Sequence, residues 1–262
     1  MDWQIAALLA QDGVTNGAIY ALLAIALVMV FAVTRVILIP QGEFVTYGAL
    51  TLATLQAGRL PGVVWLVLGM ALVAALSDAL RAARAARGRQ VAWRAVGWQA
   101  ARTVALPALV AIVAAWLAPL KLALPLQIVL TLAIVAPLGP LLYRVAFQPL
   151  AGRPVLVLLI VAVAAHLALT GLALIFFGAE GARTPPFSEA NYRLGALTVS
   201  SQSLWILGAA LALIAALAAC FGRTLYGKAL RATAFNPIGA RLIGFSPEAA
   251  GRLSFTLSLI HI

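Results

Sequence analysis

The chain has 262 residues, of which 64% are hydrophobic and only 10% are charged, and its mean hydropathy is +1.06. A soluble domain carries about 25% charged residues, so this composition excludes a single soluble domain with an ordinary core. The net charge of +11 would suit a nucleic-acid-binding protein. The basic residues, however, interrupt apolar segments and form no continuous stripe, which argues against nucleic acid as a partner.

Long apolar segments alternate with short polar ones, as in a polytopic α-helical membrane protein. The predicted fold class is therefore all-α, with about seven full transmembrane helices plus a partial eighth. The last run is about half of the ~20 residues that a crossing helix needs, so we expect the chain to be a fragment. In chain order, the predicted spans are Gly13–Val33, Leu38–Gly58, Gly62–Leu76, Thr103–Ala118, Leu122–Leu142, Val155–Gly178, Leu204–Phe221 and the partial Leu253–Ile262.

Three basic clusters indicate which ends of the spans face the cytoplasm. They lie at Arg81–Arg102, Arg144–Arg153 and Arg223–Arg252. Placing all three inside agrees with strict alternation of the spans and puts the N-terminus outside. The Ala/Arg-rich part of Asp78–Arg102 is interpreted as an interfacial amphipathic helix. Tyr143–Pro154 is expected to form the second basic loop.

The second span begins with Gln41, Gly42, Glu43 and Phe44, directly after Pro40. Proline and glycine beside a carboxylate predict a broken or re-entrant helix entry. A carboxylate next to an apolar span is costly unless it is paired or faces water, so Glu43 would line a polar path, with Gly42 allowing close backbone approach. The alternative is that Glu43 caps a helix start at the inner interface.

Other polar side chains inside the spans admit two interpretations. Asn16 and Tyr20 in the first span either make hydrogen bonds between helices or meet a substrate. His166 is alone in its span, and the nearest carboxylate in sequence is Glu180. We therefore expect a hydrogen-bonded packing role for His166 rather than a proton relay.

The third basic cluster is longer than a simple connection requires. Its sequence predicts a short amphipathic helix, then Asn236 and Pro237, then a second helical turn. Such a helix pair suits docking into a groove on another protein. A helix lying on the lipid surface is the alternative.

Enzymatic and metal signatures are missing from the sequence. It contains no GxxxxGK[ST] phosphate loop, no HExxH and no GxSxG. The single cysteine, Cys220, and the two histidines, His166 and His261, stand at unrelated positions, which does not predict a zinc site. The sequence therefore predicts no catalytic residue and no metal site.

Three stretches carry recognisable motifs. Asn16–Leu50 is similar to a run from N-G-x-x-Y-A-L to H-G-E-F, Tyr143–Gly178 to an R-V-A-x-R-P-L loop and its following span, and Tyr226–Ser258 to a G-x-A-x-R-A-x-A-x-N loop. In these motifs the chain resembles the permease family of branched-chain amino-acid ABC importers (LivH type). Gln41 replaces the family's usual His, and Gln148 its Arg. The resemblance implies one permease domain over 1–262, with an atypical insertion at about 62–142 and a coupling loop at about 223–251.

The resemblance also implies roles and partners. The partners would be a second permease subunit, two cytoplasmic ATPases that hold the ATP and Mg, and a periplasmic solute-binding protein, beside membrane lipid. The chain itself would need no cofactor and would lie in the bacterial inner membrane, importing Leu, Ile, Val or related small amphipathic solutes. The substrate pathway would include Asn16, Tyr20, Gly42, Glu43 and Tyr47, and the coupling loop would act through Gly227, Arg231, Asn236 and Gly244.

Two other classes of function are consistent with the residues. An ion-coupled secondary transporter would carry ionisable groups at the membrane midplane, for which Glu43 and His166 are the candidates. A membrane scaffold with no transport is the third hypothesis, against which the polar residues of the first two spans argue.

Overall fold

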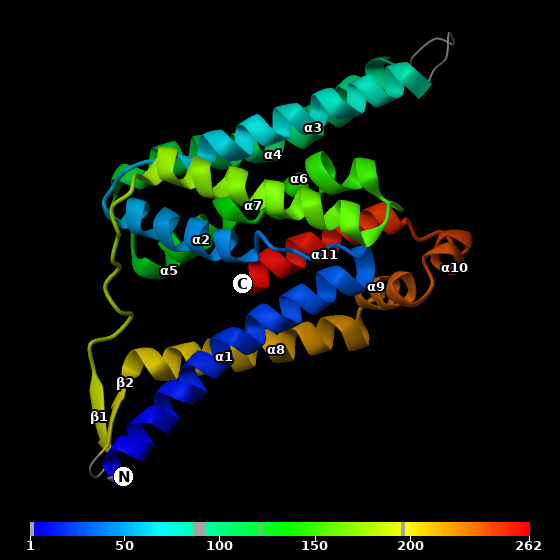
Figure 1. Cartoon of the computed structure of the whole chain (residues 1–262). Helices are drawn as coiled ribbons and strands as arrows, with labels where there is room; N and C mark the ends of the chain where they lie inside the picture. The colour runs from blue at the N-terminus through cyan, green and yellow to red at the C-terminus, as the bar shows by residue number, and fades with distance from the viewer. Residues whose placement is uncertain (1–2, 86–92, 121, 195–196) are drawn as a thin grey trace.

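The computed structural model describes residues 3–85, 93–120, 122–194 and 197–262. These residues form a helical assembly with one small β-hairpin (Figure 1). The α-helices are α1 (Trp3–Thr34), α2 (Gln41–Gln56), α3 (Val63–Ala85), α4 (Trp93–Leu117), α5 (Leu124–Val135), α6 (Leu138–Leu142), α7 (Val155–Phe177), α8 (Ser201–Arg223), α9 (Leu225–Phe235), α10 (Pro237–Leu242) and α11 (Pro247–His261). Shorter elements are the 3-10 turns η1 (Ala118–Leu120) and η3 (Gln148–Leu150), the π-helical η2 (Tyr143–Phe147), and the antiparallel strands β1 (Asn191–Leu194) and β2 (Leu197–Ser200).

Within the described residues, six helical segments are long and apolar enough to cross a membrane. This confirms the all-α, polytopic class. The six segments are Ile5–Thr34, Val63–Arg84, Trp93–Leu120, Leu124–Leu150, Val155–Phe177 and Ser201–Arg223.

The predicted span at Leu38–Gly58 forms the shorter helix α2, which has 16 residues. At 1.5 Å per residue, α2 is about 24 Å long, less than the ~30 Å of hydrocarbon. The chain before it is not helical, and Pro40 stands at the N-cap position of α2. The predicted break at the helix entry is therefore present.

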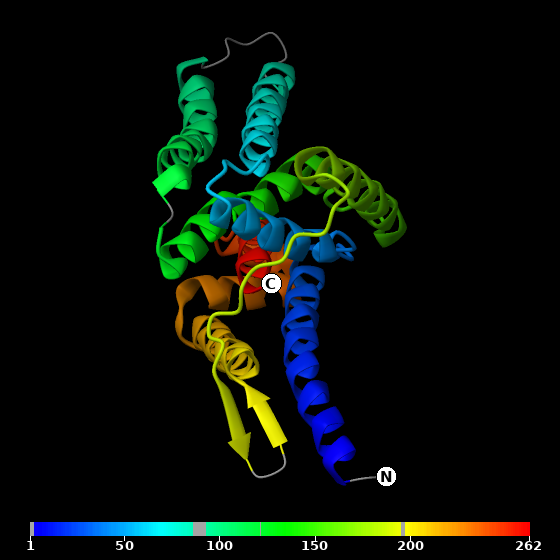
Figure 2. The ribbon, with the colours of Figure 1, turned by 90° about the vertical axis from the view of Figure 1, so that its left-hand side faces the viewer.

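The Arg-rich segment after the third span corrects two predictions. The span expected to end at Leu76 continues as α3 to Ala85, and α4 begins at Trp93, well before Thr103. Alanine and arginine are strong helix formers, so the helices persist beyond the apolar edge. The described part of the segment is thus the far end of an antiparallel α3–α4 pair rather than a separate interfacial helix, and residues 86–92 lie outside the described ranges (Figure 2).

The second basic loop also differs from its prediction. Tyr143–Leu150, expected as loop, continues the helical course of α6 through η2 and η3. A π-turn keeps the backbone hydrogen-bonded while it changes the direction of the side chains. Only Ala151–Pro154 connects this segment to α7 without helix.

The predicted alternation of the spans is consistent with the arrangement of the elements. In Figure 1 the tip of the α3–α4 pair lies on the same side of the molecule as α9 and α10, whereas the N-terminus and the β-hairpin lie at the opposite end. Basic residues from separate clusters therefore collect at one end of the helices.

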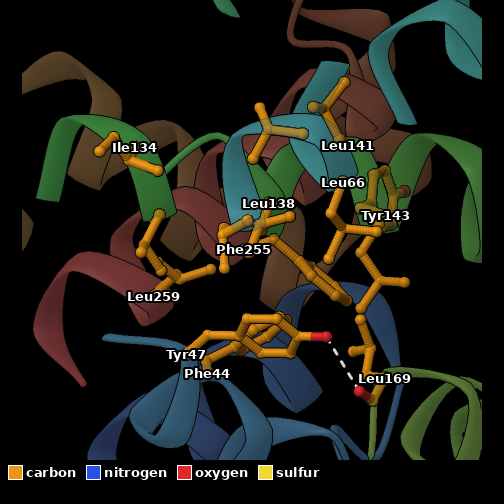
Figure 3. Close-up of a cluster of buried hydrophobic side chains, with 14 of the residues drawn as sticks. Phe44, Tyr47, Leu66, Ile134, Leu138, Leu141, Tyr143, Leu169, Phe255 and Leu259 are labelled. Atoms are coloured by element: carbon orange, nitrogen blue, oxygen red, sulfur yellow. Dashed lines mark hydrogen bonds between the residues drawn. The ribbon is translucent and has the colours of Figure 1, made fainter. Parts of the chain in front are cut away.

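The hydrophobic core is contributed mainly by α2, α3, the α5–α6 segment and α7, and α11 packs onto it while lying against α1 and α6 (Figure 1). Phe255 of α11 packs against Tyr143 and Phe147, with ring centroids 5.0 and 5.6 Å apart. Figure 3 shows Phe255 among side chains of α6 and η2. A Cβ at Gly139 would lie only 2.6 Å from the carbonyl oxygen of Phe255, so glycine permits this close approach.

Candidate functional site

A polar cluster joins the first turn of α2 to the middle of α7. Oε1 of Glu43 lies 3.0 Å from the hydroxyl of Thr170 and 3.2 Å from Nδ1 of His166. The Glu43 side chain is only 14% exposed. Contacts with a hydroxyl and an imidazole offset the cost of holding a carboxylate in apolar surroundings. Glu43, His166 and Thr170 are called the Glu43 cluster below.

The Glu43 cluster corrects the interpretation of His166 as a residue without a carboxylate nearby. The structure brings Glu43 beside it, although the two are far apart in sequence. The His166 side chain is 37% exposed, and its Nδ1 is not aligned for a hydrogen bond with the carboxylate. His166 thus has a buried ring nitrogen, Nδ1, that forms no hydrogen bond with the described residues.

Glu43 also sits where its helix favours a negative charge. It lies in the first turn of α2, where the helix dipole is positive. No side-chain hydrogen bond from the N-cap residue, Pro40, completes the end of α2. Glu43 contacts α7 instead, so the same side chain lies at the start of α2 and also joins α2 to α7.

Tyr47 lies one turn beyond Glu43 and is a buried link between α2 and α7. It is 0% exposed, and its hydroxyl donates a 2.9 Å hydrogen bond to the carbonyl oxygen of Leu169 (Figure 3). Its ring meets Phe177 edge to face, with centroids 6.0 Å apart. These contacts fix how α2 lies against α7.

Gly42 and Gln41 differ in their contacts with the rest of the chain. No other segment approaches Gly42 closely, because a Cβ there would meet nothing within 4 Å. Gln41 instead makes the close contact: its Nε2 donates a 2.6 Å hydrogen bond to the carbonyl oxygen of Leu23. This bond ties the start of α2 to α1.

Asn16 and Tyr20 lie on the exposed surface of α1. Tyr20 is 70% exposed, and Asn16 is exposed as well. Both precede Leu23, the residue of α1 whose carbonyl oxygen accepts the hydrogen bond from Gln41. The structure therefore brings Glu43 and Tyr47 together on α2 and leaves Asn16 and Tyr20 on a separate helix.

The predicted coupling loop is a structured helix pair, α9 and α10. The hydroxyl of Thr224, the residue between α8 and α9, donates to the carbonyl oxygen of Cys220 at 2.7 Å and accepts from the amide of Gly227 at 3.0 Å. A Cβ at Gly227 would collide with the backbone of Cys220, so only glycine lets α9 pack this tightly on α8. Gly227 therefore holds the pair in place.

Asn236 and Gly244 define the two ends of α10. Oδ1 of Asn236 accepts a 2.9 Å hydrogen bond from the amide of Gly239 and caps the helix. Gly244 has φ +92°, a conformation that glycine adopts without strain. Both sequence-predicted residues thus have structural reasons to be of their type.

The outer face of α9 and α10 is apolar and exposed. Arg231 stands exposed beside this face. Among the described residues of the helix pair and its exit, six large apolar side chains are between 69% and 93% exposed: Leu225, Tyr226, Phe235, Ile238, Leu242 and Ile243. An apolar surface of this kind is typical of a protein–protein contact.

An ion pair joins the end of α10 to the start of α11. Arg241 contacts Oε1 of Glu248 at 2.7 Å, and the hydroxyl of Ser246 donates to its Oε2 at 2.7 Å. The bond from Ser246, with smaller help from Arg241, lowers the pKa of the Glu248 carboxyl. Glu248 therefore stays ionised and holds α10 against the start of α11.

Sequence reasoning missed the partners of Glu43. His166 and Thr170 are four residues apart and so share one face of α7, which was a usable signal. Their pairing with α2 had no signal in a single sequence. No group of three or more potential metal ligands occurs within the described ranges.

Comparison with known proteins identifies the family. Residues 95–260 match the family described as "Branched-chain amino acid transport system / permease component". The match covers the stretches Tyr143–Gly178 and Tyr226–Ser258, whereas Asn16–Leu50 lies outside it, and it includes residues 95–142 of the segment expected as an insertion.

Searches of curated proteins and of solved structures find no match. The family match nevertheless takes in more than half of the chain. The chain therefore belongs to the branched-chain amino acid transport system permease component family, as a multi-pass, non-catalytic transmembrane subunit.

Proposed function

We propose that the chain is the permease subunit of an ATP-driven importer that moves branched-chain amino acids, or related small amphipathic solutes, across the bacterial inner membrane. The observation that carries this proposal is the exposed apolar face of α9 and α10, held rigidly by Thr224 and Asn236. A rigid helix pair with an apolar face suits docking into a groove on a partner. The partner is proposed to be a cytoplasmic ATPase.

The proposed complex contains a second permease subunit, two ATPases and a periplasmic solute-binding protein. ATP and Mg belong to the ATPases, and this chain uses no cofactor of its own. Closure of the ATPases around nucleotide would favour the permease conformation that their closed state binds better. Gly227, Arg231, Asn236 and Gly244 are the proposed coupling residues.

The orientation follows from the basic clusters. The end that carries α9, α10 and the tip of α3–α4 is proposed to face the cytoplasm, because positively charged segments stay on that side. The N-terminus and the β-hairpin would then be periplasmic. The β-hairpin and the polar chain before it lie at the end where a binding protein would deliver its solute.

The proposed solute path includes Asn16, Tyr20, Gly42, Glu43 and Tyr47. An amino acid carries both an ammonium and a carboxylate group. In the Glu43 cluster, the carboxylate of Glu43 would accept from the ammonium group, and the imidazole of His166 would contact the carboxylate of the amino acid. The apolar surroundings strengthen both contacts. Tyr47 would act by positioning, since its side chain is fully buried.

The decisive experiment compares two charge reversals in cells that carry the whole transporter. Arg231→Glu should abolish uptake of labelled leucine and reduce recovery of the ATPases in a tagged pull-down, while membrane insertion stays normal. Arg193→Glu, on exposed strand β1 at the other end, is the matched control and should leave ATPase recovery unchanged. Normal uptake by Arg231→Glu would refute the coupling assignment.

Ion coupling is the second candidate, and the contact between Glu43 and His166 is the observation that favours it. Paired ionisable groups inside a membrane often carry protons. Uptake by an ATP-driven importer should stop on ATP depletion and survive an uncoupler for as long as ATP is maintained. Uptake that survives ATP depletion but collapses with the ion gradient would replace the importer proposal.

A further inference from the structure

A groove of about 500 Å³ lies between α4, the α5–α6 segment and α11. Its walls are apolar along most of their length, with Leu106 and Val110 on one side and Ala133 and Pro137 on the other. Arg144 and Arg252 also line it. An otherwise apolar groove thus contains two cationic side chains.

Small and cyclic side chains create this space. Ala133 and Ala136 are too short to fill the gap between α5 and α4. Pro137 follows the end of α5, and Pro140 lies within the short helix α6, so the helix is interrupted beside the groove. The groove is therefore built into the packing of these helices.

The positive charge at Arg144 is only partly balanced by its neighbours. Arg144 pairs with Asp78, and its Nη1 donates a 2.9 Å hydrogen bond to Thr103. Asp78 also contacts Arg81 at 3.2 Å, so one carboxylate serves two guanidinium groups. This group keeps a net positive charge next to the groove.

Arg252 adds a second cation. It is half-buried, and its side chain forms no ion pair with any other described residue. Glu248 lies one turn earlier on α11 but already contacts Arg241. Arg252 therefore retains most of its capacity to bind an anion.

Trp98 of α4 indicates that this end of the groove lies near a membrane surface. Trp98 is 64% exposed, and the guanidinium of Arg102 lies 5.0 Å from its ring centroid. Tryptophan on a lipid-facing helix favours the level of the headgroups. Thr103 is five residues further along α4, about 7.5 Å at the helical rise. Arg144, bonded to Thr103, is thus within reach of a lipid phosphate.

We propose that this groove is a binding site for one phospholipid with an anionic headgroup, taken from the leaflet at the basic end of the molecule. The phosphate would contact Arg252 and Arg144, and an acyl chain would lie along Leu106, Val110, Ala133 and Pro137. The apolar length of the groove and the 61% exposure of Leu106 fit a lipid tail. The two arginines select an anionic headgroup over a zwitterionic one, since each basic residue near the surface contributes about 1 kcal/mol.

The test measures lipid retention and does not depend on transport. The transporter complex is purified in detergent, titrated with phosphatidylglycerol or with phosphatidylcholine of the same chains, and analysed by native mass spectrometry. Wild-type chain should retain one phosphatidylglycerol in preference to phosphatidylcholine. Arg252→Gln should lower that retention about fivefold, the equivalent of one basic contact, and Arg252→Lys should restore most of it.

Two further variants test the apolar part of the groove and control for loss of an unrelated positive charge. Ala136→Phe would fill the groove without changing charge and should reduce retention of the lipid. Arg59→Gln removes an exposed cation at the other end of the molecule and should have no effect.

Equal retention of the two lipids by the wild type, or an equal loss in Arg59→Gln and Arg252→Gln, would overturn the proposal. Glycerol 3-phosphate that competes as well as phosphatidylglycerol would also overturn it, because the acyl chain would then contribute nothing.

Discussion

Helices α8 and α11 differ in the relation between hydropathy and burial: α8 is apolar and exposed, whereas α11 is more polar and buried. The α8 segment is long and strongly apolar, yet only 6% of its most apolar stretch is buried. The shorter α11 carries Ser254, Ser258 and His261, and all three are buried. Hydropathy thus identifies the helix surface offered to lipid, whereas small and polar residues mark where helices contact one another.

Truncation of one large side chain on each helix should have the largest difference in effect. Phe255→Ala removes the buried ring of α11 and should cost about 3–5 kcal/mol of unfolding free energy. Leu211→Ala on α8, where the side chain is 69% exposed, should change it by less than about 0.5 kcal/mol. Thermal unfolding in detergent micelles measures both, and similar losses would refute the contrast.

Glycine substitutions should differ in sign between the surface of α6 that contacts α11 and the exposed helix α8. Gly139→Ala places a methyl group 2.6 Å from the Phe255 carbonyl oxygen and should destabilise by about 1–3 kcal/mol. Gly208→Ala on α8 meets nothing within 4 Å and should stabilise by about 0.5–1 kcal/mol through helix propensity. The same unfolding assay checks the pair, and destabilisation by both would show that α8 also packs closely.

Two buried serines of α11 should respond differently to the loss of their hydroxyl groups. Ser254 donates a 2.9 Å hydrogen bond to the Gly251 carbonyl oxygen, so Ser254→Ala should cost about 0.5–1.5 kcal/mol. The hydroxyl of Ser258 is buried without a partner among the described residues, so Ser258→Ala should be neutral or stabilising. A clear loss in Ser258→Ala would mean that its hydroxyl bonds to something outside the described chain.

The smallest effect is expected at the start of α11, where Glu248 is bonded to Ser246. Because the folded pKa of Glu248 is lowered, its stabilisation is present above the unfolded carboxyl pKa of ~4.3 and is lost as pH falls through the folded value. Glu248→Gln should therefore flatten the fall in melting temperature below about pH 4. Glu189→Gln, at an exposed position before β1, is the control and should leave the profile unchanged.

Much of the membrane arrangement was predictable because apolar runs have clear limits. Pro154 and Gly178 bound the predicted span Val155–Gly178, and α7 fills it to within one residue. The predicted ends of α3 and α4 were less accurate because hydropathy indicates which residues lie in the hydrocarbon layer and not where a helix ends. Alanine and arginine continue a helix into water.

Other features lay beyond reasoning from this one sequence. The contact of Glu43 with His166 joins helices far apart in the chain, and no local pattern encodes it. The β-hairpin was detectable in principle, because Tyr192 and Leu194 alternate with polar residues in the strand that pairs with Leu197–Ser200. The all-α prediction did not consider this alternation and therefore missed the hairpin.

Thr224 has a mechanical consequence. It is the single residue between α8 and α9, and its hydroxyl bonds to both helices. The angle between the axes of α8 and α9 is therefore restricted by a one-residue connection and by the hydrogen bonds of the Thr224 side chain. A displacement of α9 would therefore act directly on the membrane-spanning helix α8, because no flexible linker lies between the two helices.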